Sequence, residues 1–320
     1  MNIELAVLDS QLNSCIEILN KNNLSYDDDI DLTLIAVEDE IIGTVSLSGN
    51  TIKCLSVLEE HQGKGVANAL VNKVIKLLET REIYHYFAYT KEDNRDIFVN
   101  LGMKEIINVE GITLFEGGIN SIEEYLNNLK KKYSLNLEYA SIVMNLNPLT
   151  NGHLYLIEKA AKENDNVIIF VVEEDKSKFK FKDRFKLCVD VCKRFDNVTV
   201  VPSTPYMVSK ATFSTYFIKD KGLVNELYAK IDFAIFKKYF AKLFNIKKRY
   251  IGTEPICKVT NSYNNVMLDD GFDIVLVDRI KHFDNYISAS IVRELMKKDV
   301  ELIKDYVPKE TYELIKNDFR

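Results

Sequence analysis

The sequence lacks the features that mark membrane, secreted and nucleic-acid-binding proteins. No apolar run is long enough to span a bilayer, and Glu4, Asp9 and Asn13 interrupt the N-terminus too early for a signal peptide. Positive charge is not in excess, because 42 Lys and Arg residues are outnumbered by 48 Asp and Glu residues, for a net charge of −6. Phosphate backbones require clustered Lys and Arg. We therefore expect a cytoplasmic protein with no membrane and no nucleic acid among its partners.

Long basic runs and paired cysteines are also missing. Short basic runs such as 130–132 and 247–249 are interpreted as solvated faces. The five cysteines are odd in number and none forms a C-x-x-C pair, which argues against a disulfide framework or structural zinc. Cys188 and Cys192 follow a helical pattern and are interpreted as small apolar core side chains. No metal site built from protein side chains is predicted.

The length and composition indicate two domains. A chain of 320 residues exceeds one average domain, and its 47% apolar and 28% charged content is that of a globular protein with a substantial core. We predict an α/β protein with an N-terminal α+β domain over 1–116, a connector over 117–139 and a doubly wound parallel sheet over 140–320. The connector contains two glycines and an amphipathic helical pattern.

The two domains differ in how their predicted strands are connected. In the first, β-rich runs over 32–37, 41–47 and 51–58 are joined by turns too short for a crossover, so they are antiparallel. In the second, strands alternate with helices, which indicates a parallel sheet. Its strands are predicted at 140–144, 167–172, 198–201, 249–251 and 273–277, and its helices near 152–163, 183–195 and 290–298. The aromatic-rich stretch 206–246 is expected to pack on this sheet as an inserted helical layer, or to contribute to an acceptor pocket.

The polar loop 145–153 lies between the first strand and the first helix of the second domain. Thr150 is a good N-cap, Gly152 allows close approach to the backbone, and His153 shares the helix face of Thr150. Free amides, the positive end of the helix dipole and an imidazole then converge, as an anion site requires. We expect the loop to bind a phosphate through Asn145, Asn147, Thr150, Gly152 and His153, and the resemblance given below implies that this phosphate belongs to ATP.

A second candidate anion site lies far downstream, in Ile287-Ser288-Ala289-Ser290-Ile291-Val292-Arg293. Two hydroxyls and a guanidinium within one helical turn suit phosphate oxygens, and Arg can bind them bidentately. The alternatives are simple N-capping for the serines and a surface ion pair for Arg293. The joint occurrence of both motifs favours phosphate binding by Ser288, Ser290 and Arg293.

Both motifs resemble those of the nucleotidyltransferase superfamily. Asn147-Pro148-x-Thr150-x-Gly152-His153 is similar to its T/H-x-G-H signature, and Ile287 to Arg293 is similar to its I-S-x-S/T-x-x-R signature. The resemblance implies attack on the α-phosphate of a nucleoside triphosphate with release of pyrophosphate. It also implies that His153 binds the α-phosphate, that Ser288, Ser290 and Arg293 hold the pyrophosphate, and that Mg²⁺ bridges phosphate oxygens.

Three further stretches are candidates for the nucleotide site. Lys176 and Lys178 follow the second strand and could neutralise the triphosphate, and Lys178 is the predicted catalytic lysine. Arg184 begins a helix, where nucleotidyltransferases often carry an Arg. Gly252 and Thr253 follow the fourth strand, where the superfamily frames adenine. The alternatives are solvated lysines, a helix-end ion pair and a tight turn.

The first domain contains a weaker phosphate-binding pattern. Gln62-x-x-Gly65-x-Ala67 resembles the Q/R-x-x-G-x-G/A pyrophosphate loop of GNAT acetyltransferases, and 94–103 resembles their later helix and turn. The resemblance implies a GNAT-like fold and possible acetyl-CoA binding at Gln62, Gly63, Lys64, Gly65 and Ala67. No distinct general base is found, because Glu59, Glu60 and His61 are interpreted as a solvated loop.

The combination of a GNAT-like unit with a T-x-G-H unit resembles the citrate lyase ligase family. Gly252-Thr253-Glu254-Pro255 through Asn264 and the tail Tyr306-Val307-Pro308 are also typical of it. The resemblance implies that ATP adenylates acetate and that the acetyl group passes to the prosthetic-group thiol of the citrate lyase acyl carrier subunit, with release of AMP and pyrophosphate.

Three other functions are compatible with the same motifs. The first is an adenylyltransferase with a phosphate acceptor, and the second is an acetyl-CoA-dependent acetyltransferase whose C-terminal domain senses nucleotide. The third is an adaptor that binds ATP without turnover. Exchange between ATP and pyrophosphate that depends on acetate would separate the ligase from the first. The second predicts acetyl transfer from acetyl-CoA that survives loss of His153, and the third predicts ATP binding without turnover.

Overall fold

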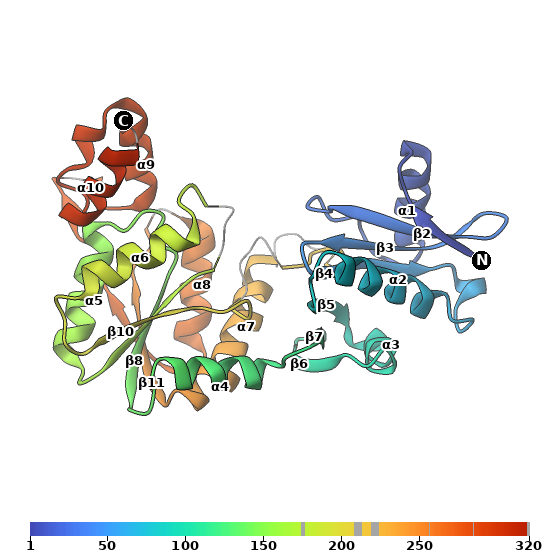
Figure 1. Ribbon diagram of the computed structural model, residues 1–320, viewed down its shortest axis with the longest axis horizontal. Helices are drawn as coiled ribbons and strands as arrows, with labels where there is room; N and C mark the ends of the chain where they lie inside the picture. Colours follow the sequence, from blue (N-terminus) through green and yellow to red (C-terminus); the bar gives the residue numbers. More distant parts are fainter. Residues whose placement is uncertain (174–176, 208–212, 219–223, 256, 284, 319–320) are drawn as a thin grey trace. The chain divides into compact units, whose positions relative to one another are not determined.

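The computed structural model describes the chain except for residues 174–176, 208–212, 219–223, 256, 284 and 319–320. Two compact units are present: Met1–Tyr125 with Lys210–Ala234, and Leu126–Ser209 with Ile235–Arg320. Each unit contains one main sheet with helices packed on it (Figure 1). The predicted fold class is confirmed. The domain bounds 1–116, 117–139 and 140–320 stay a prediction.

The first unit is built on a seven-stranded sheet in the order β1-β2-β3-β4-β5-β7-β6. All neighbours are antiparallel except β4 and β5, which pair in parallel at only two positions, Thr51 with Phe87 and Ile52 with Ala88. Beyond these positions the two strands part. The strands are β1 (Asn2–Leu5), β2 (Leu32–Val37), β3 (Ile41–Ser48), β4 (Thr51–Val57), β5 (His85–Lys91), β6 (Lys104–Val109) and β7 (Ile112–Gly118).

Helices of the first unit bury apolar faces against this sheet. Leu70, Val74 and Leu78 recur at helical spacing on α2 and pack with Val45 and Phe115 of the strands in one buried cluster. The helices are α1 (Asp9–Lys21), α2 (Val66–Thr80), α3 (Arg95–Asn100), the short η1 (Glu59–His61) and η2 (Glu92–Asn94), and the start of α4 (Ile122–Lys132).

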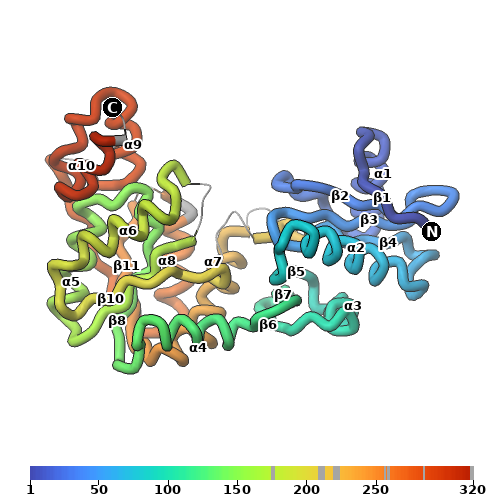
Figure 2. Tube along the Cα trace, viewed as in Figure 1, coloured from blue at the N-terminus to red at the C-terminus, as the bar shows by residue number. Residues whose placement is uncertain are grey.

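A segment from the second half of the chain completes the first unit. Thr215 donates its hydroxyl to Asp27 at 2.6 Å, and the Tyr216 hydroxyl donates to the Tyr89 carbonyl at 2.7 Å. In Figure 2 the described part of this stretch, in yellow, lies beside the teal strand β5, to which the Tyr216 bond joins it. The expectation that 206–246 forms a layer on the second sheet is therefore wrong for Lys210–Ala234, which includes most of α7 (Val224–Ile235).

The second unit is built on a five-stranded parallel sheet in the order β10-β9-β8-β11-β12. From β8 the chain adds β9 and β10 toward one edge of the sheet, and then returns to add β11 and β12 on the other side of β8. The strand order therefore reverses between β8 and β11. Ligands bind at such a switch point in open parallel sheets. The strands are β8 (Tyr139–Met144), β9 (Val167–Val171), β10 (Val198–Pro202), β11 (Ile246–Gly252) and β12 (Asp273–Val277).

Both faces of the second sheet are covered. On one face, Ile157 of α5 and Val191 of α6 pack on apolar strand residues, and on the other the Phe170 ring meets Phe240 and Phe244. In Figure 1 the helices α9 and α10 lie together at one end of this unit. The remaining elements are α5 (Asn151–Glu163), α6 (Phe181–Cys192), the π-helix η3 (Phe236–Ala241), α8 (Lys258–Asp269), β13 (Lys281–His282), β14 (Asn285–Tyr286), α9 (Ala289–Lys298), η4 (Val300–Ile303) and α10 (Lys309–Asp318).

Candidate active site

The start of α5 holds His153 in one tautomer. Thr150 caps the helix, with its hydroxyl accepting the His153 backbone N–H at 3.4 Å. In return, the Thr150 backbone N–H donates to Nδ1 of His153 at 3.0 Å. Because Nδ1 accepts this hydrogen bond, the ring proton of a neutral imidazole resides on Nε2. The local sequence thus builds a neutral donor at a helix N-terminus.

The electrostatic surroundings keep that imidazole uncharged. Burial, together with the positive charge of Arg279, lowers the pKa of His153 to about 4. Desolvation disfavours the charged form of an imidazole, and a nearby cation adds to the effect. At neutral pH, His153 is therefore a hydrogen-bond donor without a charge, suited to an oxygen on which negative charge develops.

The two distant motifs meet in the structure. A Cβ at Gly152 would lie only 3.2 Å from the Ile287 carbonyl oxygen, so a larger residue would push the start of α5 away from the segment that leads into α9. The guanidinium of Arg293 donates to the Asn147 carbonyl and, at 3.0 Å, to the Ser290 hydroxyl. Arg293 therefore joins the first motif to the second.

A cavity of about 430 Å³ opens where these helix starts meet. Its lining comes from β8, α5, β11, α8 and the residues that begin α9. Ser288 caps α9 by accepting the Ile291 backbone N–H at 3.2 Å, so this helix start also points at the cavity. The predicted site residues that line the cavity are Asn145, Thr150, Gly152, His153, Gly252, Ser288 and Ser290.

Other predicted site residues support the loops and do not line the cavity. Arg184 is 1% exposed and donates to the carbonyls of Asn145, Val172 and Phe179. Asn147 accepts the Phe179 backbone N–H on its side chain at 3.2 Å, in addition to the bond from Arg293. These contacts fix the shape of the loop before α5.

The remaining predicted residues lie at the edge of the site or outside the described chain. Thr253 accepts the Arg279 backbone N–H on its hydroxyl at 3.1 Å, which holds the turn after β11. Lys178 is exposed and does not line the cavity. Lys176 lies outside the described residues.

Several lining residues were missed by sequence reasoning. Arg249 was interpreted as part of a solvated basic run, but it is 5% exposed and lines the cavity. Arg279 also lines it and forms a salt bridge with Glu254. Asn264 donates to the Gly252 carbonyl at 2.9 Å and is nearly buried. The position of Arg249 inside an apolar strand was the available signal.

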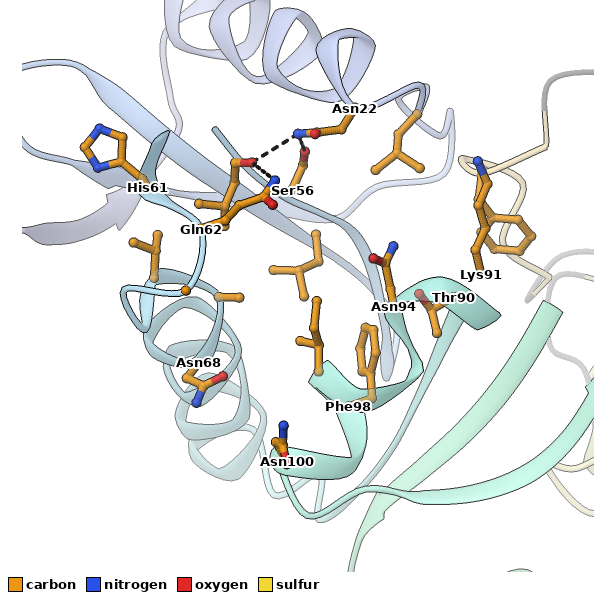
Figure 3. Close-up of a pocket in the computed structure, with 18 of the residues that line it drawn as sticks. Asn22, Ser56, His61, Gln62, Asn68, Thr90, Lys91, Asn94, Phe98 and Asn100 are labelled. Carbon is orange, nitrogen blue, oxygen red and sulfur yellow. Dashed lines mark hydrogen bonds between the residues drawn. The ribbon is translucent and has the colours of Figure 1, made fainter. Parts of the chain in front are cut away.

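The first unit contains a second cavity of about 640 Å³, between the parted strands β4 and β5 (Figure 3). Gln62 donates to the Val57 carbonyl at 3.1 Å on one side, and Thr90, Lys91 and Asn94 lie on the other (Figure 3). Four residues of the predicted pyrophosphate loop line this cavity, whereas Lys64 is exposed and does not. The four are Gln62, Gly63, Gly65 and Ala67.

Within the part of the chain that the structure describes, no helix combines the length and the apolar character needed to cross a bilayer. The same residues contain no group of three or more His, Cys, Asp and Glu side chains placed to hold a metal ion.

Comparison with known proteins assigns the family of the chain. Residues 139–315 match the model of the citrate lyase ligase C-terminal domain, and residues 8–97 match the acetyltransferase (GNAT) family. The [citrate [pro-3S]-lyase] ligase of Escherichia coli (strain K12) is 34% identical over 94% of this chain and 89% of its own length. The one of Haemophilus influenzae is 32% identical over 92% of this chain and 91% of its own. A phosphopantetheine adenylyltransferase of Campylobacter hominis is 30% identical over 51% of this chain and 86% of its own. Motifs, cavity and relatives thus agree: the chain is an enzyme of the citrate lyase ligase family.

Proposed function

We propose that the protein is an ATP-dependent ligase that activates acetate. A carboxylate oxygen of acetate attacks the α-phosphorus of ATP, which forms acetyl-adenylate and releases pyrophosphate. A thiol then attacks the acetyl carbon, which forms a thioester and releases AMP and a proton. The proposed thiol belongs to the prosthetic group of the citrate lyase acyl carrier subunit, in keeping with the names of the relatives. The need for ATP makes the cytoplasm the expected compartment.

The observation that supports this proposal is the meeting of two helix starts over one cavity. The starts of α5 and α9 both point their free amides at the space lined by Gly152, His153, Ser288 and Ser290. Helix N-termini favour phosphate through their amides and their dipoles. Two of them, 130 or more residues apart in the chain, suit different phosphates of one triphosphate.

The roles of the residues follow from the charge changes in the reaction. Acetate is already a nucleophile, so the enzyme has to align it and stabilise charge at phosphorus. Nε2 of His153 would donate to the α-phosphate as it becomes five-coordinate. The Ser288 and Ser290 hydroxyls would hold the leaving pyrophosphate. Arg293 would either contact the pyrophosphate itself or position the loop at Asn147, to whose carbonyl it donates.

The magnesium ion of the reaction would come with the nucleotide. The acidic side chains that line the described cavity are Glu254, which is engaged by Arg279, and Asp278. This donor set suits a Mg²⁺ ion that takes most of its ligands from phosphate oxygens and water. The ion would neutralise charge on the departing pyrophosphate.

The proposal is tested by exchange of labelled pyrophosphate into ATP with formate, acetate, propionate or no acid. We expect exchange that requires an acid and is fastest with acetate. Exchange that requires added phosphopantetheine in place of an acid would favour a phosphate acceptor, as in the name of the adenylyltransferase relative. ATP binding without exchange would favour an adaptor and would contradict the ligase.

We further propose that the cavity of the first unit binds a coenzyme A-like ligand, either acetyl-CoA or the prosthetic group of the carrier. The supporting observation is the parting of β4 and β5 beside a loop with Gly63 and Gly65 at φ of +70° and +83°, which exposes its amides. Coenzyme A should raise the thermal transition of the full chain, and no shift at saturating concentration would contradict this assignment.

A further inference from the structure

The cavity of the first unit is bounded on one side by a segment from the second half of the chain. Tyr216 and Phe217 line this cavity, whereas its other described lining residues lie between positions 22 and 100. The segment is bonded to β5 and to the loop after α1. The Tyr216 hydroxyl donates to the Tyr89 carbonyl at 2.7 Å, and the Tyr216 carbonyl accepts the Ser25 backbone N–H at 2.7 Å. The two rings are therefore a built part of the cavity wall.

Packing holds the two rings in place. Tyr216 is 4% exposed and Phe217 is 3% exposed. Their rings meet edge to face with 5.0 Å between centres, and the Phe213 ring meets the Phe217 ring edge to face at 6.4 Å. Thr215, the preceding residue, donates its hydroxyl to the buried Asp27 at 2.6 Å. Close-packed side chains of this kind resist displacement by a larger ligand.

The glycine loop sets the direction in which a bound ligand extends. In the proposed coenzyme A-like site, the amides at Gly63 and Gly65 take the phosphates. In Figure 3 the pale yellow ribbon of the aromatic segment lies beside Lys91, across the cavity from Gln62. A ligand with its phosphates at the loop and its arm along the parted strands β4 and β5 therefore ends at the two rings.

We propose that Tyr216 and Phe217 restrict the acyl group that the first unit accepts on a pantetheine thiol to a short one such as acetyl. The inference rests on the proposed coenzyme A-like ligand and adds the residues that select its acyl group. A free thiol or an acetyl thioester fits against the packed rings, whereas a longer acyl chain has to displace one of them. Extra methylene groups in packed surroundings force such shifts and weaken binding. The thiol arm is common to coenzyme A and to the prosthetic group of the carrier.

Binding of coenzyme A compounds to the full chain tests this assignment without requiring turnover. Calorimetric titration compares coenzyme A, acetyl-CoA and octanoyl-CoA. Phe217→Leu shortens the side chain that lines the cavity, and Phe217→Ala shortens it further. Phe213→Leu is the matched control, because Phe213 is equally buried in the same segment but does not line the cavity. The same acyl groups on the acyl carrier subunit are titrated in parallel, and the tighter binder identifies the source of the thiol.

We expect the wild type to bind acetyl-CoA about 10–100-fold more tightly than octanoyl-CoA. Both Phe217 variants should narrow this ratio by about tenfold, because the shorter side chain leaves room for the longer acyl group. Their affinity for coenzyme A, which has no acyl group, should change by no more than about threefold. Phe213→Leu should keep the wild-type ratio. If Phe217→Ala does not fold, Phe217→Leu decides.

Equal binding of acetyl-CoA and octanoyl-CoA by the wild type would overturn the inference and leave the coenzyme A-like site in place. The wild-type ratio in a folded Phe217 variant would have the same meaning, and so would an equally narrowed ratio in Phe213→Leu. Absence of binding by all three compounds and by the carrier would refute the coenzyme A-like ligand itself, and the inference with it.

Discussion

The two helix starts that face the two cavities are built differently. Helix α2 follows Gly65, a glycine at φ of +83° that has no side chain to cap the amides of the first turn. Helix α5 follows Thr150, which caps the helix and positions His153. The first arrangement offers backbone donors to a phosphate that is bound and does not react. The second adds a side-chain donor, which can respond to charge that develops during a reaction.

The largest expected effect comes from removing that donor. His153→Ala should lower acetate-dependent ATP–pyrophosphate exchange by ~10²–10³-fold, because a donor to the reacting phosphate is lost. His61→Ala is the matched control, since His61 lines the cavity of the first unit. It should leave exchange within about twofold of wild type.

These two histidine variants can break the comparison. Wild-type exchange in His153→Ala would remove the imidazole from the mechanism and leave the α5 start as a holding site like that of α2. Equal losses in both variants would show that the cavity of the first unit also contributes to ATP–pyrophosphate exchange. Measuring ATP affinity beside the exchange rate separates loss of binding from loss of chemistry.

The next effect concerns the link between the two motifs of the second unit. Arg293 donates both to the Asn147 carbonyl and to Ser290, and a lysine ammonium cannot reproduce that fork. Arg293→Lys should therefore lower exchange by about 10–100-fold, nearly as much as Arg293→Ala. Lys297→Met changes an exposed lysine of the same helix and should have no effect.

A lysine variant at 293 with near-wild-type exchange would show that charge alone is needed there. A loss of exchange confined to Arg293→Ala would then mean that Arg293 stabilises the pyrophosphate through its positive charge. A loss shared by both variants would support its hold on the loop before α5. Either result bears on how the second unit builds a site from two distant segments.

Local patterns predicted most of the second sheet. The strand Asp273–Val277 was predicted with the bounds that the structure has, because an apolar run between polar turns carries its own signal. Lys210–Ala234 was not assigned to the first unit, because what holds it there is non-local: Thr215 bonds Asp27, and Tyr216 bonds Tyr89, across more than 100 residues. No window of sequence contains such contacts.

The candidate site shows the same difference between local patterns, which could be predicted, and non-local contacts, which could not. Thr150, Gly152 and His153 could be predicted to lie together because one helix start fixes them. Arg249 could not, since its chemistry depends on rings contributed by Phe236 and Tyr263 from other elements. Arg184 was placed near the site but was expected to touch ATP, whereas it is bonded to backbone carbonyls of the surrounding loops. Sequence spacing reports neighbours along one element and not the direction in which a buried side chain points.

The smallest expected effect is a pH dependence that belongs to the α5 start. The folded state lowers the pKa of His153 to about 4 from an ordinary value of 6.5. Between these values the unfolded chain binds a proton that the folded chain does not, so the free energy of unfolding falls as the pH falls. We expect a loss of about 1 kcal/mol between pH 7 and pH 5.5 from this group. Urea unfolding of wild type and His153→Ala across that range should give curves that converge toward low pH. Parallel curves would mean that the imidazole has the same pKa in the folded and the unfolded protein. The hydrogen bond from the Thr150 amide would then not keep Nδ1 unprotonated.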